Sequence, residues 1–185
     1  MNNLFPTYEI GSLPKLNARV KAIKGQRVTD DTIKEIQTLS QRLSVEGSEV
    51  ISLLIRLKTE PRKLTLAEES SLADFNSLLY LRLQEAAGLD IVYDGEARRA
   101  EMYQHVATQI NGFEKLPEMI RSRGPDSWRM AVCVAPPRLK EGSLDTLVTK
   151  EFDFICQHAR RPTKVPLDDP YMIAVMSDNR YYLER

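Results

Sequence analysis

The stretch of sequence that decides the fold is residues 88–110, GLDIVYDGEARRAEMYQHVATQI. Its first part, Leu89–Tyr93, is a short apolar run between a glycine and Asp94-Gly95, a pattern typical of a buried strand that enters a turn. Apolar side chains then return at helical spacing, at Ala100, Tyr103, Val106, Ala107 and Ile110. A strand followed by an amphipathic helix is half of a βαβ unit. Asp94 and Glu96 are therefore predicted at the carboxyl end of a parallel strand, where α/β folds place their chemistry.

The composition is that of an ordinary soluble globular domain. Of 185 residues, 42% are hydrophobic and 28% are charged, and 26 basic residues balance 26 acidic ones. This balance gives no electrostatic reason to expect nucleic acid or a membrane surface as a partner, so we expect a small-molecule ligand. The first residues lack the pattern of a signal peptide, and no apolar run reaches the roughly 18 residues of a spanning helix. We therefore expect a cytoplasmic protein.

A first strand is predicted at Leu4–Ile10, and Gly11-Ser12 ends it. A glycine and a serine at the carboxyl end of a strand expose backbone N–H groups and a hydroxyl, which could hold the charged groups of an amino-acid ligand. The alternative is that Gly11 and Pro14 only turn the chain, because Gly-Ser turns are common.

Residues 15–87 are predicted to be helical throughout. Thr65 and Glu68 form a capping-box pattern at one helix start, and Gly88 is a helix stop. This much helix between the first two strands exceeds what a simple crossover needs. Residues 45–64 are therefore interpreted as a helical insertion on the outer layer.

Two more strand–helix pairs are predicted beyond the central stretch. The strands are Arg129–Ala135, which Pro136-Pro137 should end, and Pro162–Leu167; the helices are Ser143–Ala159 and a segment from Tyr171 onward. The total is about four βα units. It predicts the α/β class and the first half of a (β/α)8 TIM-type barrel, with residues 1–185 as a single, incomplete domain.

Three blocks of sequence carry a resemblance: LFPTYEIGSLP at residues 4–14, AGLDIVYDGEARR at residues 87–99 and KVPL at residues 164–167. Together they resemble the cobalamin-independent methionine synthase family, and more particularly the first half of its catalytic barrel. The resemblance implies a (β/α)8 barrel that transfers a methyl group from a methylated folate to the zinc-bound thiolate of homocysteine.

By the same resemblance, Ile10, Gly11 and Ser12 would hold the amino-acid part of homocysteine, and Glu96 would pair with its ammonium group. A carboxylate opposite a Gly-Ser turn at a barrel mouth is a suitable clamp for a zwitterion. Other interpretations of the same residues stay open. Glu96 could be a first-turn carboxylate that complements a helix dipole, and Asp94 could either contact the ligand or close the turn through an Asx bond.

Several residues are relevant to whether the chain binds a folate. Arg98 and Arg99 could steer its acidic tail, or could be solvated on an exposed helix face. The chain departs from the family at Ser127-Trp128-Arg129, where the classical enzymes present a folate-contacting Arg-Cys pair, and at Asp168-Asp169, where a Thr-Gly turn is usual. The sequence leaves the methyl donor open.

The supply of soft metal ligands is small: His105, His158, Cys133 and Cys156. Cys156 and His158 are the closest pair, but residues two apart on a helix face roughly opposite sides and cannot readily share one ion. We therefore expect no metal site within this chain and two reduced cysteines. By resemblance, the zinc ligands come from the second half of the barrel, so zinc is expected in the completed enzyme.

Four parallel strands cannot close a barrel, so the expected partner is a missing carboxyl-terminal half or a second copy of the chain. The first hypothesis is the amino-terminal portion of a methionine-synthase-like S-methyltransferase. The second is a non-catalytic, self-associating half-barrel that binds an amino acid or a thiol. A third is another member of the wider barrel superfamily that contains uroporphyrinogen decarboxylase and the corrinoid-dependent methyltransferases.

Overall fold

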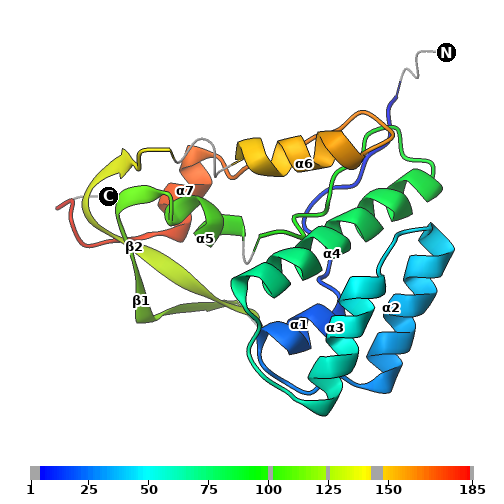
Figure 1. Ribbon diagram of the computed structural model, residues 1–185. Helices are drawn as coiled ribbons and strands as arrows, with labels where there is room; N and C mark the ends of the chain where they lie inside the picture. The colour runs from blue at the N-terminus through cyan, green and yellow to red at the C-terminus, as the bar shows by residue number, and fades with distance from the viewer. Residues whose placement is uncertain (1–4, 100–101, 124–125, 143–147, 184–185) are drawn as a thin grey trace. The chain divides into compact units, whose positions relative to one another are not determined.

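The computed structural model describes residues 5–99, 102–123, 126–142 and 148–183 of the chain (Figure 1). The chain divides into two compact units. The first unit consists of Met1–Arg98 and Phe154–Lys164, and the second consists of Arg99–Asp153 and Val165–Arg185. Each unit is therefore made of two stretches of chain that are distant in sequence.

Helices make up most of the first unit: α1 Asn17–Ile23, α2 Asp30–Leu43, α3 Ser48–Thr59 and α4 Leu66–Ala86. The prediction of a helical region between residues 15 and 87 is confirmed. Its core is formed by apolar side chains of these helices, among them Ile33, Ile36, Leu54, Leu57, Phe75 and Leu79. Leu54 and Leu57 are at most 1% exposed, so α3 shares the core of the unit.

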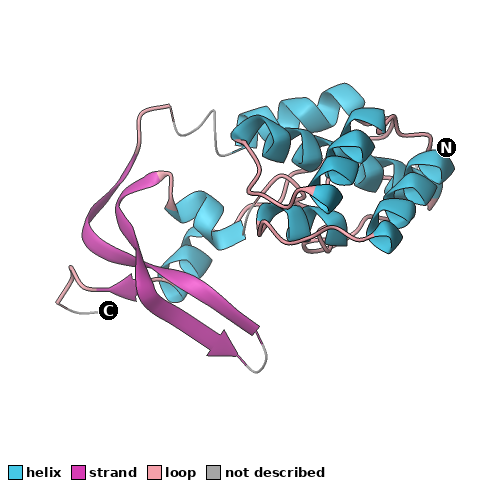
Figure 2. Cartoon of the chain, turned by 60° about the horizontal axis from the view of Figure 1, so that its bottom comes forward, coloured by secondary structure: helices cyan, strands magenta, loops and turns pink. Residues whose placement is uncertain are grey.

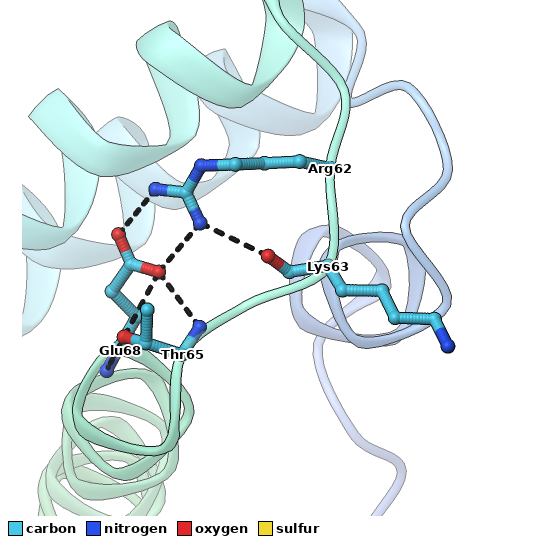
Figure 3. Close-up of polar contacts among 4 residues, drawn as sticks. All are labelled: Arg62, Lys63, Thr65 and Glu68. Carbon is cyan, nitrogen blue, oxygen red and sulfur yellow. Dashed lines mark hydrogen bonds and ion pairs between the residues drawn. The ribbon is translucent and has the colours of Figure 1, made fainter.

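The amino terminus of α4 carries the capping box that the sequence predicts (Figure 3). Thr65 Oγ1 accepts a 3.3 Å hydrogen bond from the Glu68 N–H, and Glu68 Oε2 accepts a 2.9 Å bond from the Thr65 N–H. Arg62 donates to both oxygens of the Glu68 carboxylate, at 2.6 and 2.8 Å, and to the carbonyl oxygen of Lys63. The carboxylate therefore satisfies a helix-start N–H and fixes the segment that precedes the helix.

These contacts of Glu68 predict a pH dependence of stability. The Arg62 guanidinium, followed by the Thr65 N–H, lowers the pKa of the Glu68 carboxyl from 4.5 to about 2. Because the folded-state pKa is the lower one, the contribution to stability is complete above about pH 4.5 and is lost as the pH falls toward 2. Urea denaturation should show Glu68→Gln to be less stable than wild type at pH 7, by a margin that shrinks in acid. A margin that does not change with pH would contradict this prediction.

Extended segments of the first unit lie next to one another in parallel. Tyr8 forms a single bridge with Ile91, and Val92 forms one with Thr163. The segments involved are the strands predicted at residues 4–10, 89–93 and 162–167, of which Leu4 lies outside the described residues. Their parallel direction is confirmed, although the pairing is limited to isolated bridges.

The second unit contains a long antiparallel hairpin (Figure 2). β1 Ile110–Arg123 pairs with β2 Asp126–Leu139, and the two-residue β3 Asp178–Asn179 pairs in parallel with β2. A strand at residues 129–135 is therefore confirmed, but its interpretation as a parallel barrel strand is wrong, because it pairs antiparallel with β1 and its only parallel pairing among the described residues is with the two-residue β3. Of the four predicted parallel strands, the other three appear in the described residues only as extended segments joined by isolated bridges. The α/β class is confirmed, and a half-barrel stays a prediction.

Pro136-Pro137 do not end β2, contrary to the prediction. The register of the hairpin shifts between Asn111 and Phe113, so β2 bulges where the two prolines lie. A bulge leaves residues without a ladder partner, and it can therefore accept prolines, which have no N–H to donate. A Cβ atom on Gly112 would lie 2.5 Å from the carbonyl oxygen of Ala135, so the close approach at the bulge requires glycine.

The described residues also contain three shorter helices: α5 Met102–Ala107, α6 Lys150–His158 and α7 Pro170–Met176. The helix after the Asp-Gly-Glu turn is shorter than predicted, and Ile110 begins β1 instead of lying on its apolar face. Residues 143–147 of the helix predicted at Ser143–Ala159 lie outside the described residues. No helix in the described ranges is long and apolar enough to cross a membrane.

The amino terminus of α7 explains one of the two departures from the family pattern. Oδ1 of Asp169 accepts a 2.8 Å hydrogen bond from the Met172 N–H, and Pro170 occupies the first turn. Aspartate is among the preferred helix caps, and proline is tolerated in the first turn because its missing N–H is not needed there. Asp169 therefore serves the fold as a helix cap.

Candidate functional site

Two loops that follow parallel segments meet at the candidate site. The Ser12 hydroxyl donates a 2.7 Å hydrogen bond to Oε2 of Glu96, and the Leu13 N–H donates a 3.0 Å bond to the carbonyl oxygen of Gly95. The loops leave the carboxyl ends of neighbouring segments, which the Tyr8–Ile91 bridge joins. The structure thus brings Ser12 and Glu96 together as the sequence predicts, while their ligand role stays a prediction.

The Asp-Gly-Glu turn has an unusual backbone that the Asp94 carboxylate holds in place. Gly95 and Glu96 are both left-handed, with φ of +66° and +60°. Oδ1 of Asp94 accepts a 2.9 Å hydrogen bond from the Glu96 N–H, and Oδ2 accepts one of 2.9 Å from the Ser77 hydroxyl. The Asx bond is confirmed. Because Asp94 is also fully buried, the structure favours turn closure over ligand contact for this residue.

Left-handed backbone at a residue other than glycine costs about 1–2 kcal/mol. Glu96 adopts this left-handed conformation, and its side chain contacts Ser12. Strained backbone of this kind clusters at functional sites, because it aims a side chain where relaxed backbone would not.

Substituting Gly95 with alanine should open this turn. A Cβ atom at Gly95 would lie 2.7 Å from Cβ of Leu13, and φ is unfavourable for alanine. We expect overpacking to lower the free energy of unfolding by about 1–3 kcal/mol, in addition to the cost of the backbone conformation. Gly88→Ala is the matched control, because φ there is +82° and nothing lies within 4 Å of the added atom. Equal losses for both variants in urea denaturation would exclude a close Gly95–Leu13 contact.

The Glu96 side chain is buried but only half satisfied. It is 3% exposed; Oε2 bonds to Ser12, and Oε1 has no hydrogen-bond partner among the described residues. A buried carboxylate oxygen without a donor costs free energy, and donors on a ligand would remove that cost. The interpretation of Glu96 as a first-turn helix carboxylate is wrong, because residues 95–98 form a turn and residue 99 is not helical.

Tyr93 contacts the loop of the site, a role that the sequence did not indicate. Its hydroxyl donates to the carbonyl oxygen of Gly11. Its backbone is held by Gln84, whose Nε2 donates to the Tyr93 carbonyl at 2.7 Å and whose Oε1 accepts from the Tyr93 N–H at 3.3 Å. Burial first, and then the charges of Glu96, Glu9 and Asp94, raise the pKa of Tyr93 to about 12. The phenol therefore stays protonated and keeps donating to the Gly11 loop. The only signal in the sequence was a tyrosine that ends an apolar run.

The rest of the first loop is open. Ile10 is 79% exposed, and its N–H bonds to Oε1 of Glu9 at 3.0 Å. Gly11 has φ of +84°, and nothing lies within 4 Å of a Cβ atom built on it. The predicted ligand-binding loop is therefore accessible in the described part of the chain, next to the buried Glu96 carboxylate.

The two arginines after the turn are paired, so their interpretation as solvated residues is wrong. Arg98 forms an ion pair with Asp74 and lies 4.4 Å over the ring centroid of Phe154. Arg99 is 2% exposed and pairs with Glu151 at 2.9 Å. Both arginines are paired within the chain, and a role toward a folate tail stays a prediction.

The described residues contain no group of three or more His, Cys, Asp or Glu side chains placed to hold a metal ion. Cys133 is buried and donates to the carbonyl oxygen of Ala135 at 3.4 Å. Cys156 is exposed and lies 3.5 Å from the Thr163 hydroxyl, and Nδ1 of His158 lies 2.8 Å from the carbonyl oxygen of Phe154. These residues do not offer a zinc site, and the absence of one in the whole chain stays a prediction.

Comparisons with known proteins agree with the resemblance. Residues 54–143 match the family described as cobalamin-independent synthase, catalytic domain. The methionine synthase of Pyrococcus abyssi is 37% identical over 110 residues, which are 59% of this chain and 31% of that protein. The methionine synthase of Thermococcus kodakarensis is 37% identical over 107 residues, 57% of this chain and 30% of that protein. A more distant relative, the 5-methyltetrahydropteroyltriglutamate–homocysteine methyltransferase of a Synechococcus strain, is 27% identical over 118 residues.

These matches relate the chain to the cobalamin-independent methionine synthase family over part of its catalytic domain. The family match includes the Asp-Gly-Glu turn, whereas residues 4–14 and 164–167 of the resemblance lie outside it. The matched region spans less than a third of the archaeal relatives' length. The activity and the substrates of the whole relatives therefore come to this chain only as proposals.

Proposed function

We propose that this chain is the amino-terminal portion of a methionine-synthase-like S-methyltransferase and binds the amino-acid part of homocysteine at the Ser12–Glu96 site. The observation that carries the proposal is the buried Oε1 of Glu96, which has no donor among the described residues although Oε2 is bonded to Ser12. The family relationship supports it, because the relatives are named methionine synthases.

The chemistry of the site suits an ammonium group. An ammonium carries three N–H donors and a full positive charge, so it would satisfy Oε1 of Glu96 and compensate the buried carboxylate. The exposed backbone of Ile10 and Gly11 lies beside it for the remainder of the amino acid. On this proposal, the loop positions the substrate.

On this proposal, the zinc is held by another part of the enzyme. The described residues do not fit a zinc site, so the zinc and its ligands are expected on a carboxyl-terminal half that completes the barrel. That half, or a second copy of the chain, is the proposed partner, and the cytoplasm is the proposed location. The methyl donor, a methylated folate or another compound, would also be held mainly by the completed barrel.

The non-catalytic binding module is the competing proposal, because the same loop and carboxylate would serve it. Co-expression with a zinc-bearing carboxyl-terminal half from an archaeal relative distinguishes the two. Methyl transfer to homocysteine by the pair, and by neither part alone, supports the enzyme. Amino-acid binding without transfer in a stably assembled pair supports the module.

Ligand binding to the chain tests the shared part of the proposal. Calorimetry and amide NMR should detect saturable binding of L-methionine, with shifts at Ser12 and Glu96. L-Norleucine, which keeps the ammonium and carboxylate groups, should also bind. 4-(Methylthio)butanoate, which lacks the ammonium group, should not. No saturable amino-acid binding, or equal binding of the compound without nitrogen, would overturn the proposal.

A further inference from the structure

The ammonium group of Lys164 lies close to the loop that contains Gly11 and Ser12. Its N–H donates to the Val92 carbonyl oxygen at 3.2 Å, which fixes its backbone next to the strand that leads into the site. Its Nζ lies 4.0 Å from the ring centroid of Tyr8 and 4.9 Å from that of Tyr93, and it donates to the carbonyl oxygen of Glu9. The ammonium group is therefore oriented by two aromatic rings and one backbone oxygen.

The Lys164 charge has no ion-pair partner among the described residues, whose ion pairs all involve other side chains. Burial lowers the pKa of Lys164, and the nearby Glu9 carboxylate partly offsets this effect. An ammonium has three donors, and the Glu9 carbonyl takes one of them. Lys164 thus resembles Glu96 in one respect: each is a partly desolvated charge with hydrogen-bonding capacity to spare.

A continuous chain of contacts connects the two charges. The Tyr93 ring lies beside Lys164, and its hydroxyl bonds to the carbonyl oxygen of Gly11. Ser12 follows in sequence and bonds to Glu96, and the Glu96 charge is close enough to raise the pKa of Tyr93. The Gly11–Ser12 loop is therefore linked to a positive side chain through Tyr93 and to a negative one directly.

We propose that Lys164 binds the α-carboxylate of the amino-acid ligand whose ammonium group pairs with Glu96. The inference rests on the proposed function and extends it, since it makes Lys164 the residue that selects α-amino acids over simple amines. An α-amino acid carries one charge of each sign, so it would complement both groups at once. Neither Ser12 nor the backbone of the Gly11 loop provides a full positive charge for the carboxylate.

Two ligands and two variants test the proposal on the full chain. L-Methioninol keeps the ammonium group and the thioether but lacks the carboxylate. Calorimetry on the wild-type chain should show L-methioninol binding about ten- to a hundredfold more weakly than L-methionine. Lys164→Met, which keeps the length of the side chain without its charge, should weaken L-methionine binding by a similar factor and leave L-methioninol unaffected. Lys164→Arg should retain most of the preference for L-methionine.

The outcomes separate this inference from the proposed function. If wild type binds neither compound, both fail. If wild type binds L-methionine and L-methioninol equally, or if a folded Lys164→Met binds L-methionine as tightly as wild type, only the Lys164 inference fails. The comparison of two ligands on wild type needs no variant, so it decides the question even if Lys164→Met does not fold.

Discussion

Glu151→Gln should lower the free energy of unfolding by about 3–5 kcal/mol, because it leaves a buried guanidinium without its counter-charge. The Arg99 and Glu151 side chains are 1% and 6% exposed and pair at 2.9 Å. Arg99 also donates to the carbonyl oxygen of Pro166 at 2.8 Å, so Arg99 joins the two stretches of the second unit. Glutamine has nearly the same shape as glutamate, which isolates the loss of charge from any loss of packing.

The double variant Arg99→Met/Glu151→Leu is the control for this prediction. Replacing a buried ion pair with apolar side chains of similar size is often neutral or stabilising, so the double variant should recover most of the loss. Urea denaturation of wild type, Arg99→Met, Glu151→Leu and the double variant gives the coupling between the two residues. A loss below about 1 kcal/mol for Glu151→Gln would mean that the pair is solvated in solution, as surface ion pairs are.

The features that the sequence predicted well are set by neighbours in the chain. The capping box of Thr65 and Glu68 lies within one helical turn, and the Asx bond from Asp94 to the Glu96 N–H spans two residues. Such signals do not depend on where the rest of the chain goes. The extended segment that ends in the Asp-Gly-Glu turn was likewise predictable, because its apolar run and its turn are contiguous in the sequence, although it forms only isolated bridges.

The errors concern contacts between residues that are far apart in sequence. Arg98 and Arg99 follow a turn and look exposed, but Asp74 and Glu151 lie at distances along the chain that no spacing rule relates to them. The hairpin of β1 and β2 was missed for a related reason. Pro136-Pro137 normally stop a strand, and only a partner strand with a shifted register makes the bulge that accommodates them.

The Ser12–Glu96 contact is the exception, a long-range feature that was predicted. The two residues are 84 positions apart; the family resemblance put them in one site, and each was predicted to follow a parallel strand. Carboxyl ends of parallel strands meet at one edge, so topology replaces local spacing as the guide. The same argument did not predict the contacts of Tyr93 and Lys164, because a tyrosine or a lysine within an extended segment gives no signal of the face on which it lies.

Glu96→Gln should weaken L-methionine binding by about ten- to a hundredfold, because it removes the charge that meets the ammonium group while keeping the shape of the side chain. We expect no loss of stability in this variant. Glu96 is a buried carboxylate with one oxygen lacking a donor among the described residues, so neutralising it removes a desolvation cost and should leave the free energy of unfolding unchanged or slightly higher.

Glu68→Gln provides the matched control for this last prediction, since it is the same chemical change at the capping box of α4. It should lower the stability of the helix and leave L-methionine affinity unchanged, the reverse of the pattern expected at Glu96. Calorimetry and urea denaturation of both variants and of wild type give all the values needed. Unchanged affinity in a folded Glu96→Gln chain would exclude the ammonium-binding role, and a large loss of stability there would mean that Glu96 serves the fold through its bond with Ser12.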